Sequence, residues 1–361
     1  MGTPLSVSEP PTVSVIVPAR NEEACLGACL ESLVAQVGVA FEIIVVDDGS
    51  SDRTRSIAES FPGVLVIEPG PLPPGWSGKN NAVSAGVRRA RGEWLLFTDA
   101  DTVHRPGSMA RAVAEVKEQG ADLLSYSPEQ EVRSFWEKAI MPVIFAELAS
   151  TYRPAEVSDP KSSVAAANGQ YLLVSREAYE AVGGHAARAG DLLEDVALAR
   201  AIKLTGRRIF FRYGGDRVRT RMYQSFQQLT EGWTKNLVLL FPSPGALAVK
   251  RLAEFCLIIG SATALLPASM GVVPAPWARW VAWGRWAFFA DAGITCVLFS
   301  TLFFARIRKA HFSWDSTLLA IFGLPLFFYL LLRSKLFYRR GKISWKGRTY
   351  GGGAARTMPI S

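Results

Sequence analysis

The stretch FEIIVVDDGS, residues 41–50, places an apolar run directly before two carboxylates and a glycine. A similar run, VSVIVPAR at 13–20, precedes it, and stretches with helical spacing follow the two runs from Glu22 and from Asp52. Short strands that alternate with amphipathic helices build a mostly parallel sheet covered by helices. The sequence therefore predicts an α/β domain. The same pattern places further strands at 64–67, 94–98 and 122–126.

Polar residues that follow the strands are the first candidates for chemistry, because ligands of such sheets bind beyond the carboxyl ends of the strands. Asp47 and Asp48 follow the run at 41–46. A carboxylate there can accept a hydrogen bond from a uracil-type ring N–H or a ribose hydroxyl, and Gly49 permits the tight turn beside it. A simple turn explains an Asp-Gly pair equally well, so this element alone leaves both interpretations open.

A second acidic pair, Asp99 and Asp101, follows the run WLLFT at 94–98. Residues two apart in an extended chain point to the same side, so these carboxylates can bind one divalent cation and leave positions open for diphosphate oxygens. We expect Mg²⁺ or Mn²⁺, because hard oxygen ligands suit these ions better than zinc or copper.

A third acidic pair, Glu194 and Asp195, opens a predicted helix. The helix dipole favours an ionised carboxylate in the first turn, so Asp195 is a candidate general base that takes a proton from an acceptor hydroxyl. Acidic residues are favoured at helix starts in any case, which is the alternative explanation. The helix itself is predicted from an apolar stripe formed by Leu192, Val196, Ala199 and Ile202.

The composition changes near residue 245 from a charged, soluble pattern to long apolar runs. The net charge of +8 lies entirely in the last 29 residues, because Arg333–Ser361 contains eight Lys or Arg and no acid. A basic segment behind an apolar helix is typical of contact with anionic lipid headgroups, whereas nucleic-acid proteins carry their basic residues on a folded face. We therefore expect a membrane and no nucleic acid as the partner.

Three segments approach the roughly 20 apolar residues that a bilayer crossing needs. They are 252–273, 287–305 and 316–332. Three crossings from a cytosolic first domain would place the basic segment outside, against the positive-inside tendency. Either 316–332 does not cross, or another segment such as 276–286 pairs with a neighbour.

These patterns divide the chain into four parts. A disordered lead covers 1–11, the α/β domain 12–243, a transmembrane helical domain 244–335 and a basic tail 336–361. The stretch 222–240 has a helical apolar stripe that fits an interfacial helix and a packed core equally well. Residues 150–167 are expected to form a loop over the acceptor.

The acidic motifs together resemble the family 2 glycosyltransferases, whose GT-A fold has a Rossmann-like, mostly parallel sheet. The resemblance covers residues 12–240 and rests on PARNEE at 18–23, DDGS at 47–50, DAD at 99–101 and ED at 194–195. It implies that the nucleotide base and donor contact Glu22, Asp47 and Asp48. It further implies that Asp99 and Asp101 hold the metal and diphosphate, and that Asp195 is the catalytic base of an inverting transfer.

A narrower similarity points to bacterial membrane glycosyltransferases that act on carotenoid, hopanoid or sphingoid-type lipids. It implies a UDP- or GDP-sugar donor, a hydroxyl or carboxyl acceptor on a lipid, and a multi-pass inner-membrane protein with a cytoplasmic catalytic domain. Lys79 approaches phosphate in this interpretation, or else caps and solvates its helix. The motifs are GWSGKNNA at 75–82, GGH at 183–185, RMY at 221–223, GWTKN at 232–236 and WKGRTY at 345–350.

Several alternatives stay open or are disfavoured by single residues. A polyprenyl-phosphate sugar synthase usually shows DADLQ where this chain has DADTV at 99–103. A processive synthase ends in Q-x-x-R-W, but Gly232 precedes Trp233 here. A nucleotidyltransferase would need a glycine-rich start that is missing. A non-catalytic scaffold that only binds a nucleotide sugar is the remaining alternative.

Overall fold

The two apolar runs that open the sequence form neighbouring parallel strands, β1 (Val13–Ala19) and β2 (Phe41–Asp47). They belong to a seven-stranded sheet with the order β3-β2-β1-β4-β8-β6-β9. Only β8 is antiparallel to its neighbours β4 and β6. The predicted mostly parallel sheet is thus confirmed. Its other strands are β3 (Val64–Ile67), β4 (Trp94–Phe97), β6 (Leu123–Ser127), β8 (Leu172–Ser175) and β9 (Ile209–Tyr213).

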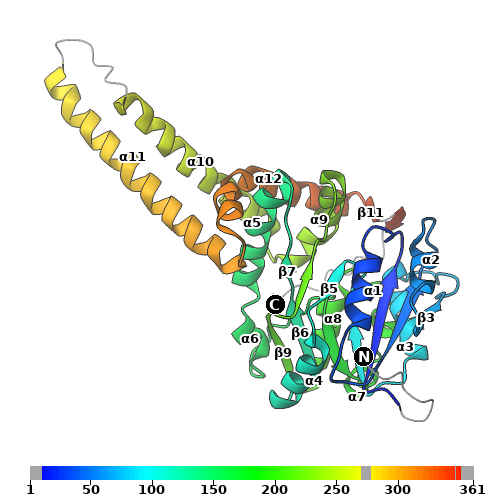
Figure 1. Cartoon of the computed structure of the whole chain (residues 1–361). Coiled ribbons are helices and arrows are strands. Elements are labelled where there is room, and N and C mark those ends of the chain that lie inside the picture. Colours follow the sequence, from blue (N-terminus) through cyan, green and yellow to red (C-terminus); the bar gives the residue numbers. More distant parts are fainter. Residues whose placement is uncertain (1–9, 270–277, 346, 351–361) are drawn as a thin grey trace.

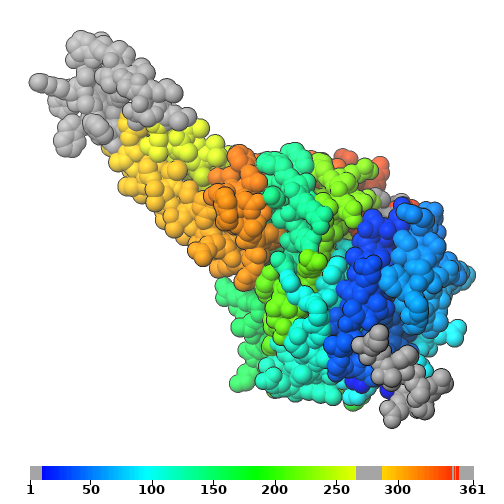
Figure 2. Space-filling view, viewed as in Figure 1, coloured from blue at the N-terminus to red at the C-terminus, as the bar shows by residue number. Residues whose placement is uncertain are grey.

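The structure is a computed structural model that describes residues 10–269, 278–345 and 347–350. Most of the expected disordered lead, residues 1–9, lies outside the described residues, as do 351–361 at the end of the expected basic tail. Figure 1 shows an α/β domain with a helical layer beside it, from which an arm of two helices projects. Figure 2 shows that this arm stands clear of the domain.

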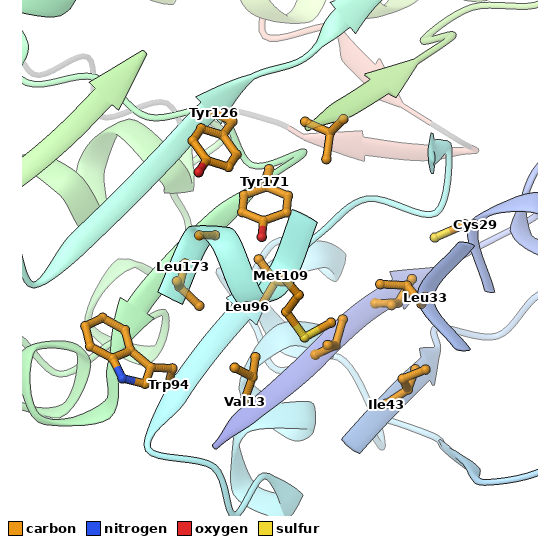
Figure 3. Close-up of a cluster of buried hydrophobic side chains, with 14 of the residues drawn as sticks. Val13, Cys29, Leu33, Ile43, Trp94, Leu96, Met109, Tyr126, Tyr171 and Leu173 are labelled. Atoms are coloured by element: carbon orange, nitrogen blue, oxygen red, sulfur yellow. The ribbon is translucent and has the colours of Figure 1, made fainter. Parts of the chain in front are cut away.

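Helices cover both faces of the sheet because alternate strand residues point to opposite sides. Val13, Val15 and Val17 face one core, whereas Ile16 faces the other. Figure 3 shows part of the first core, where the ring centroids of Tyr126 and Tyr171 lie 4.9 Å apart. The first face packs against α1 (Leu26–Val34), α2 (Thr54–Glu59) and α4 (Ser108–Glu118). The second packs against α3 (Gly78–Arg89), α7 (Arg176–Ala181) and α8 (Glu194–Leu204).

A third core joins the helices that follow the sheet with one helix from within the α/β sequence. That helix, α5, begins at a capping box in which Ser134 and Glu137 satisfy each other's backbone N–H groups. A Cβ at Gly323 would lie 2.0 Å from the carbonyl oxygen of Ala139, so glycine lets α12 approach α5 closely. The layer comprises α5 (Phe135–Thr151), α9 (Phe226–Leu240), α10 (Pro244–Ser269), α11 (Ala278–Ile307) and α12 (Trp314–Arg339).

Smaller elements complete the chain and correct one expectation. Residues 150–167, expected as a loop, include the end of α5 and the short helix α6 (Pro154–Ser158). The segment expected as the basic tail includes the end of α12 and the hairpin formed by β11 and β12. The remaining elements are β5 (Thr102–His104), β7 (Glu129–Gln130), β10 (Val218–Thr220), η1 (Ala186–Arg188), η2 (Arg308–Ala310), β11 (Ile343–Trp345) and β12 (Arg348–Tyr350).

Two of the expected membrane segments are helices long and apolar enough to cross a bilayer. These are residues 287–310 in α11 with the following turn, and residues 314–339 in α12. The first expected segment, 252–273, lies in α10 and continues past Ser269 outside the described residues. The segment 276–286 also begins outside them. These helices indicate membrane association.

Candidate functional site

One cavity of about 960 Å³ lies between the carboxyl edge of the sheet and the helical layer. Asp48 reaches it from the end of β2, and Asp99 and Asp101 from the end of β4. Glu194 and Asp195 reach it from the first turn of α8. One carboxylate of the first acidic pair and both carboxylates of the other two pairs therefore meet at one site, where Glu22 and Lys79 also line the wall.

Lys79 joins the acidic residues of two elements. Its ammonium nitrogen lies 2.8 Å from Asp99 Oδ1 and 2.8 Å from Glu194 Oε1. Ser77 caps α3 by accepting from the backbone N–H of Asn80, which holds Lys79 in the first turn. Burial alone would lower the pKa of Lys79, but Asp99 and Glu194 raise it well above its ordinary value. Lys79 is therefore a fixed positive charge inside the site, rather than a solvated helix cap.

Asp195 is held as an acceptor with a shifted pKa. Its Oδ2 accepts from the backbone N–H of Gly169 and its Oδ1 from that of Val196, both at 2.8 Å. Burial, followed by the neighbouring charge of Glu194, raises the pKa of Asp195 to about 6. A carboxylate that titrates near neutral pH suits proton transfer at the pH of a cell.

The adjacent Glu194 behaves in the opposite way. Burial alone would raise its pKa, but Lys79 and Lys235 lower it below the ordinary value. Two neighbouring carboxyl groups whose environments push their pKa values apart are typical of an acid–base site. Glu194 is thus the permanent anion that holds Lys79, and Asp195 is the group that can exchange a proton.

Asp99 and Asp101 fit a divalent cation that the substrate would help to bind. Asp99, Glu194 and Asp195 face the two ammonium groups of Lys79 and Lys235, and Asp101 lines the same cavity, so this cluster holds more carboxylates than ammonium groups. Within the described residues, no three His, Cys, Asp or Glu side chains converge on one point. Magnesium commonly takes one or two carboxylates and completes its shell with substrate phosphates and water. Asp99 and Asp101 are the residues that would hold it.

The first acidic pair divides between turn and cavity. Asp47 Oδ1 accepts from the backbone N–H of Ser50 at 3.1 Å, and its side chain is buried. Asp48 lines the cavity. Asp47 therefore shapes the turn that presents Asp48 to the cavity. Glu22 lines the same wall, where its Oε2 accepts from the thiol of Cys25.

The hairpin formed by β11 and β12 brings Arg348 to the part of the cavity wall where Asp48 lies. The guanidinium of Arg348 forms two contacts with the Asp48 carboxylate, and the contact from Nη2 to Oδ1 measures 3.0 Å. A Cβ at Gly78 would lie 2.6 Å from Asp48 Oδ2, so this contact needs glycine at the start of α3. The sequence shows WKGRTY only as a likeness, because no periodicity links positions 300 residues apart.

A second contact ties the same hairpin to the acid cluster. The ammonium nitrogen of Lys235 in α9 lies 5.1 Å from the ring centroid of Trp345. Lys235 also faces Glu194, Asp99 and Asp195, and burial lowers its pKa below the ordinary value. The helical layer and the C-terminal hairpin therefore help to build the site, which the sequence motifs alone place only in the α/β domain.

Part of the cavity wall is apolar and aromatic. Phe145 and Leu148 of α5 line it together with Trp233 of α9. His311, in the turn between α11 and α12, stacks on Tyr213 with the ring centroids 4.2 Å apart. One cavity is thus lined both by charged side chains and by apolar and aromatic ones.

Comparisons with known proteins agree with this geometry. The family described as Glycosyl transferase family 2 matches residues 14–183. A 4,4'-diaponeurosporenoate glycosyltransferase of Staphylococcus aureus (strain MRSA252) is 29% identical over 94% of this chain and 88% of its own length. The protein of the same name from strain USA300 is 32% identical over 62% of this chain and 60% of its own length.

A solved structure shares the fold across most of the chain. It is a mannosyltransferase from Pyrobaculum calidifontis in complex with GDP-Man and Mn²⁺, with a TM-score of 0.50 and 18% identity. The likeness covers 91% of this chain and 87% of that one. Residues 14–183 thus match the family 2 glycosyltransferases, curated glycosyltransferases are similar to most of the chain, and the chain shares the fold of a solved mannosyltransferase.

Proposed function

We propose that the chain transfers a sugar from a UDP- or GDP-sugar to a membrane lipid, with Mg²⁺ or Mn²⁺ and with inversion at the anomeric carbon. The observation that carries this proposal is a cavity lined both by the Lys79–acid cluster and by apolar side chains of the helical layer. The printed name of the curated relatives denotes a carboxylate acceptor, 4,4'-diaponeurosporenoate. The two candidate membrane helices support a lipid as the acceptor here.

The donor lies along the carboxyl edge of the sheet in this proposal. Asp48 accepts from the base or ribose, with Asp47 and Glu22 shaping that end. Lys79 approaches the diphosphate, and Asp99 and Asp101 hold the metal. When bound, the divalent cation supplies positive charge that neutralises the leaving nucleoside diphosphate.

Asp195 takes the proton of an acceptor hydroxyl as the hydroxyl oxygen attacks the anomeric carbon. The carbon–oxygen bond to the acceptor forms while the bond to the diphosphate breaks, so one displacement inverts the configuration. A carboxyl acceptor is already ionised at neutral pH and loses no proton in this step. The dependence of the rate on Asp195 therefore reports which acceptor group reacts.

The same proposal places the chain in the inner membrane as a multi-pass protein, with the catalytic domain on the cytoplasmic side. Nucleotide sugars are made in the cytosol, so the donor end of the cavity has to face it. The basic residues Arg308 and Lys309, directly after α11, are exposed and fit the cytosolic side by the positive-inside tendency.

The test is product analysis with detergent-purified protein. Labelled UDP- and GDP-sugars are supplied with Mn²⁺ and with two lipid pools, one with hydroxyl and one with carboxyl end groups. We expect a lipid-soluble product whose anomeric configuration is opposite to that of the donor. Alkali releases the sugar only if the acceptor is a carboxyl group, since that bond is an ester. A retained configuration, or label found only on polyprenyl phosphate, would contradict the proposal.

Arg348 gives a separate prediction about the donor. Because its guanidinium lies against Asp48 and Gly78, beside Lys79, we expect it to bind the donor diphosphate. A hydrogen bond between charged groups contributes about 1.5–3 kcal/mol, so Arg348→Ala should weaken UDP or GDP binding roughly 10- to 100-fold. Calorimetry with Mn²⁺ measures this. Arg340→Ala is the matched control, because Arg340 is exposed at the end of α12. Equal affinity for the wild type and Arg348→Ala would refute the role.

A further inference from the structure

Helix α12 has two apolar faces of different character. The inner face packs against α5 and α9 and is fully buried at Ala320, Leu324, Phe327, Leu330, Leu331 and Ser334. The outer face is a stripe of large side chains between 41% and 77% exposed. These are Trp314, Leu318, Phe322, Tyr329, Leu332 and Leu336. Their spacing of three, four and seven residues keeps them on one side of the helix, so α12 is half packed and half uncovered along its whole length.

The uncovered stripe continues onto neighbouring helices. Phe322 lies 6.4 Å from Phe135 at the start of α5, measured between ring centroids. Phe135 contacts Trp136 at 5.2 Å, and Trp136 contacts Phe226 of α9 at 5.1 Å. All four rings are at least 44% exposed. The starts of α5 and α9 and the first half of α12 thus form one apolar surface on the outside of the helical layer.

Both ends of α12 are fixed beside the catalytic domain. At its start, Asp315 accepts from Lys138 of α5 at 2.8 Å. Near its end, Ser334 donates to the carbonyl oxygen of Thr234 at 2.7 Å, and Tyr338 donates to that of Lys235 at 2.8 Å. Lys235 belongs to the acid cluster of the site. The end of α12 therefore lies at the level of the donor.

The start of α12 lies at the level of the same cavity. Lys138 adjoins Glu137, which pairs with Arg221 at 3.0 Å, and Arg221 lines the cavity. A helix of 26 residues is about 39 Å long, whereas the hydrocarbon core of a bilayer is about 30 Å thick. If α12 crossed the bilayer, its two ends would lie on opposite sides. Both ends of α12 instead adjoin the cavity proposed for the nucleotide sugar: Lys309 and His311 line it just before the helix, and Trp345 and Arg348 line it just after.

We propose that α12 lies in the plane of the membrane surface, with its outer stripe in the lipid headgroup region, and that the α10–α11 hairpin is the element that enters the bilayer. This inference rests on the membrane location proposed above. Trp314 and Tyr329 are side chains that favour the membrane interface. The basic residues Arg333, Lys335 and Arg339 near the end of α12 match anionic headgroups.

A buried ion cluster marks the boundary between the two kinds of helix. Glu147 of α5, Arg251 and Glu254 of α10, and Arg306 of α11 form ion pairs of 2.8 to 3.1 Å. From this cluster α10 and α11 extend away from the domain, whereas α12 runs along it toward β11 (Figure 1). The α10–α11 hairpin thus begins where α5 and α12 lie. Because α10 leaves from this ion cluster and α11 returns to it, both ends of the hairpin lie on the side of the catalytic domain.

This arrangement resolves the charge conflict of three crossings. Two crossings by α10 and α11 return the chain to the side of the catalytic domain, and an in-plane α12 keeps it there. Arg340 and Lys342, which follow the helix, then lie on the cytosolic side with the nucleotide sugar. The β11–β12 hairpin, whose Arg348 contacts Asp48, then lies on the cytosolic side as well.

Cysteine labelling in membranes tests this topology in the full-length chain. Single cysteines replace Arg308 before α12, Arg340 after it, and Ala275 between α10 and α11, in a parent whose four native cysteines are replaced. A membrane-impermeant maleimide is applied to spheroplasts and to inside-out vesicles. We expect positions 308 and 340 to react only in inside-out vesicles and position 275 only in spheroplasts. The cysteine-free parent is the control.

The outcomes separate this inference from the proposed membrane location. Reaction of position 340 in spheroplasts would mean that α12 crosses, and would overturn the inference while leaving the location intact. If position 275 reacts only in inside-out vesicles and the chain still resists alkaline carbonate, the hairpin does not enter the bilayer and the inference is also overturned. Release of the chain by carbonate would refute the membrane location itself.

Discussion

Asp101→Ala is expected to remove sugar transfer almost completely, with a loss of roughly 1,000-fold or more. Asp101 and Asp99 are the two carboxylates that line the cavity after β4, and the rest of the metal shell would come from the donor and water. Loss of one of the two proposed protein ligands lowers the affinity for the metal. It also lets the metal shift away from its position against the diphosphate. The measurement is the initial rate of labelled sugar transfer at saturating Mn²⁺.

The matched control for this prediction is Asp159→Ala. Asp159 is exposed after α6, and its carboxylate accepts from the backbone N–H of Lys161 nearby. We expect this variant to transfer at the wild-type rate. A second readout is the affinity for UDP or GDP with and without Mn²⁺, in which Asp101→Ala should lose the increase that Mn²⁺ causes. Wild-type transfer by Asp101→Ala would exclude a metal role for this carboxylate.

Asp195→Asn is expected to lower kcat by roughly 100- to 10,000-fold with a hydroxyl acceptor, the range that a positioned general base contributes. The amide keeps the shape of the side chain and an oxygen that can accept from Gly169 or Val196. Donor affinity should therefore stay close to that of the wild type. A large loss of donor affinity, with kcat unchanged, would assign Asp195 to binding.

The pH dependence of kcat/KM checks the same residue. Asp195 acts as a base only when it is deprotonated, and its pKa is raised to about 6 by burial and by Glu194. The rate should therefore fall as the pH drops below about 6. Glu194→Gln removes the neighbouring negative charge, so it should lower the pKa of Asp195 and move this limb to more acidic pH. A limb that stays in place in Glu194→Gln would mean that another group controls it.

The sheet and its acidic motifs could be predicted because their signals are local. The run at 41–47 and the alternation of apolar runs with helical stripes predict β1 and β2, because apolar side chains at these positions have to be buried. Both strands are buried in the structure. The strand-end rule then brings Asp48, Asp99 and Asp101 to one edge without knowledge of the loops. The roles assigned to these residues stay predictions until they are measured.

The parts that the sequence did not predict depend on contacts between distant segments. Helix α5 carries charges at Glu137 and Glu147, so its sequence does not predict that it belongs to the helical layer. In the structure α12 packs along it. The stretch 222–240, for which the sequence left an interfacial helix and a packed core open, contains α9, which is packed at Trp233 and exposed near Phe226. Arg348 meets Asp48 only after the chain has folded back from α12.

The most direct test of lipid glycosyltransfer is the Mn²⁺-dependent movement of label from a nucleotide sugar into a lipid-soluble product. Detergent-purified wild type is incubated with labelled UDP- or GDP-sugar and a bacterial lipid extract, beside Asp101→Ala and Asp159→Ala. The account predicts labelled lipid and free nucleoside diphosphate from the wild type and Asp159→Ala, and neither from Asp101→Ala or from wild type with EDTA. A wild type that binds the nucleotide sugar but forms neither product would contradict it and would favour a non-catalytic scaffold.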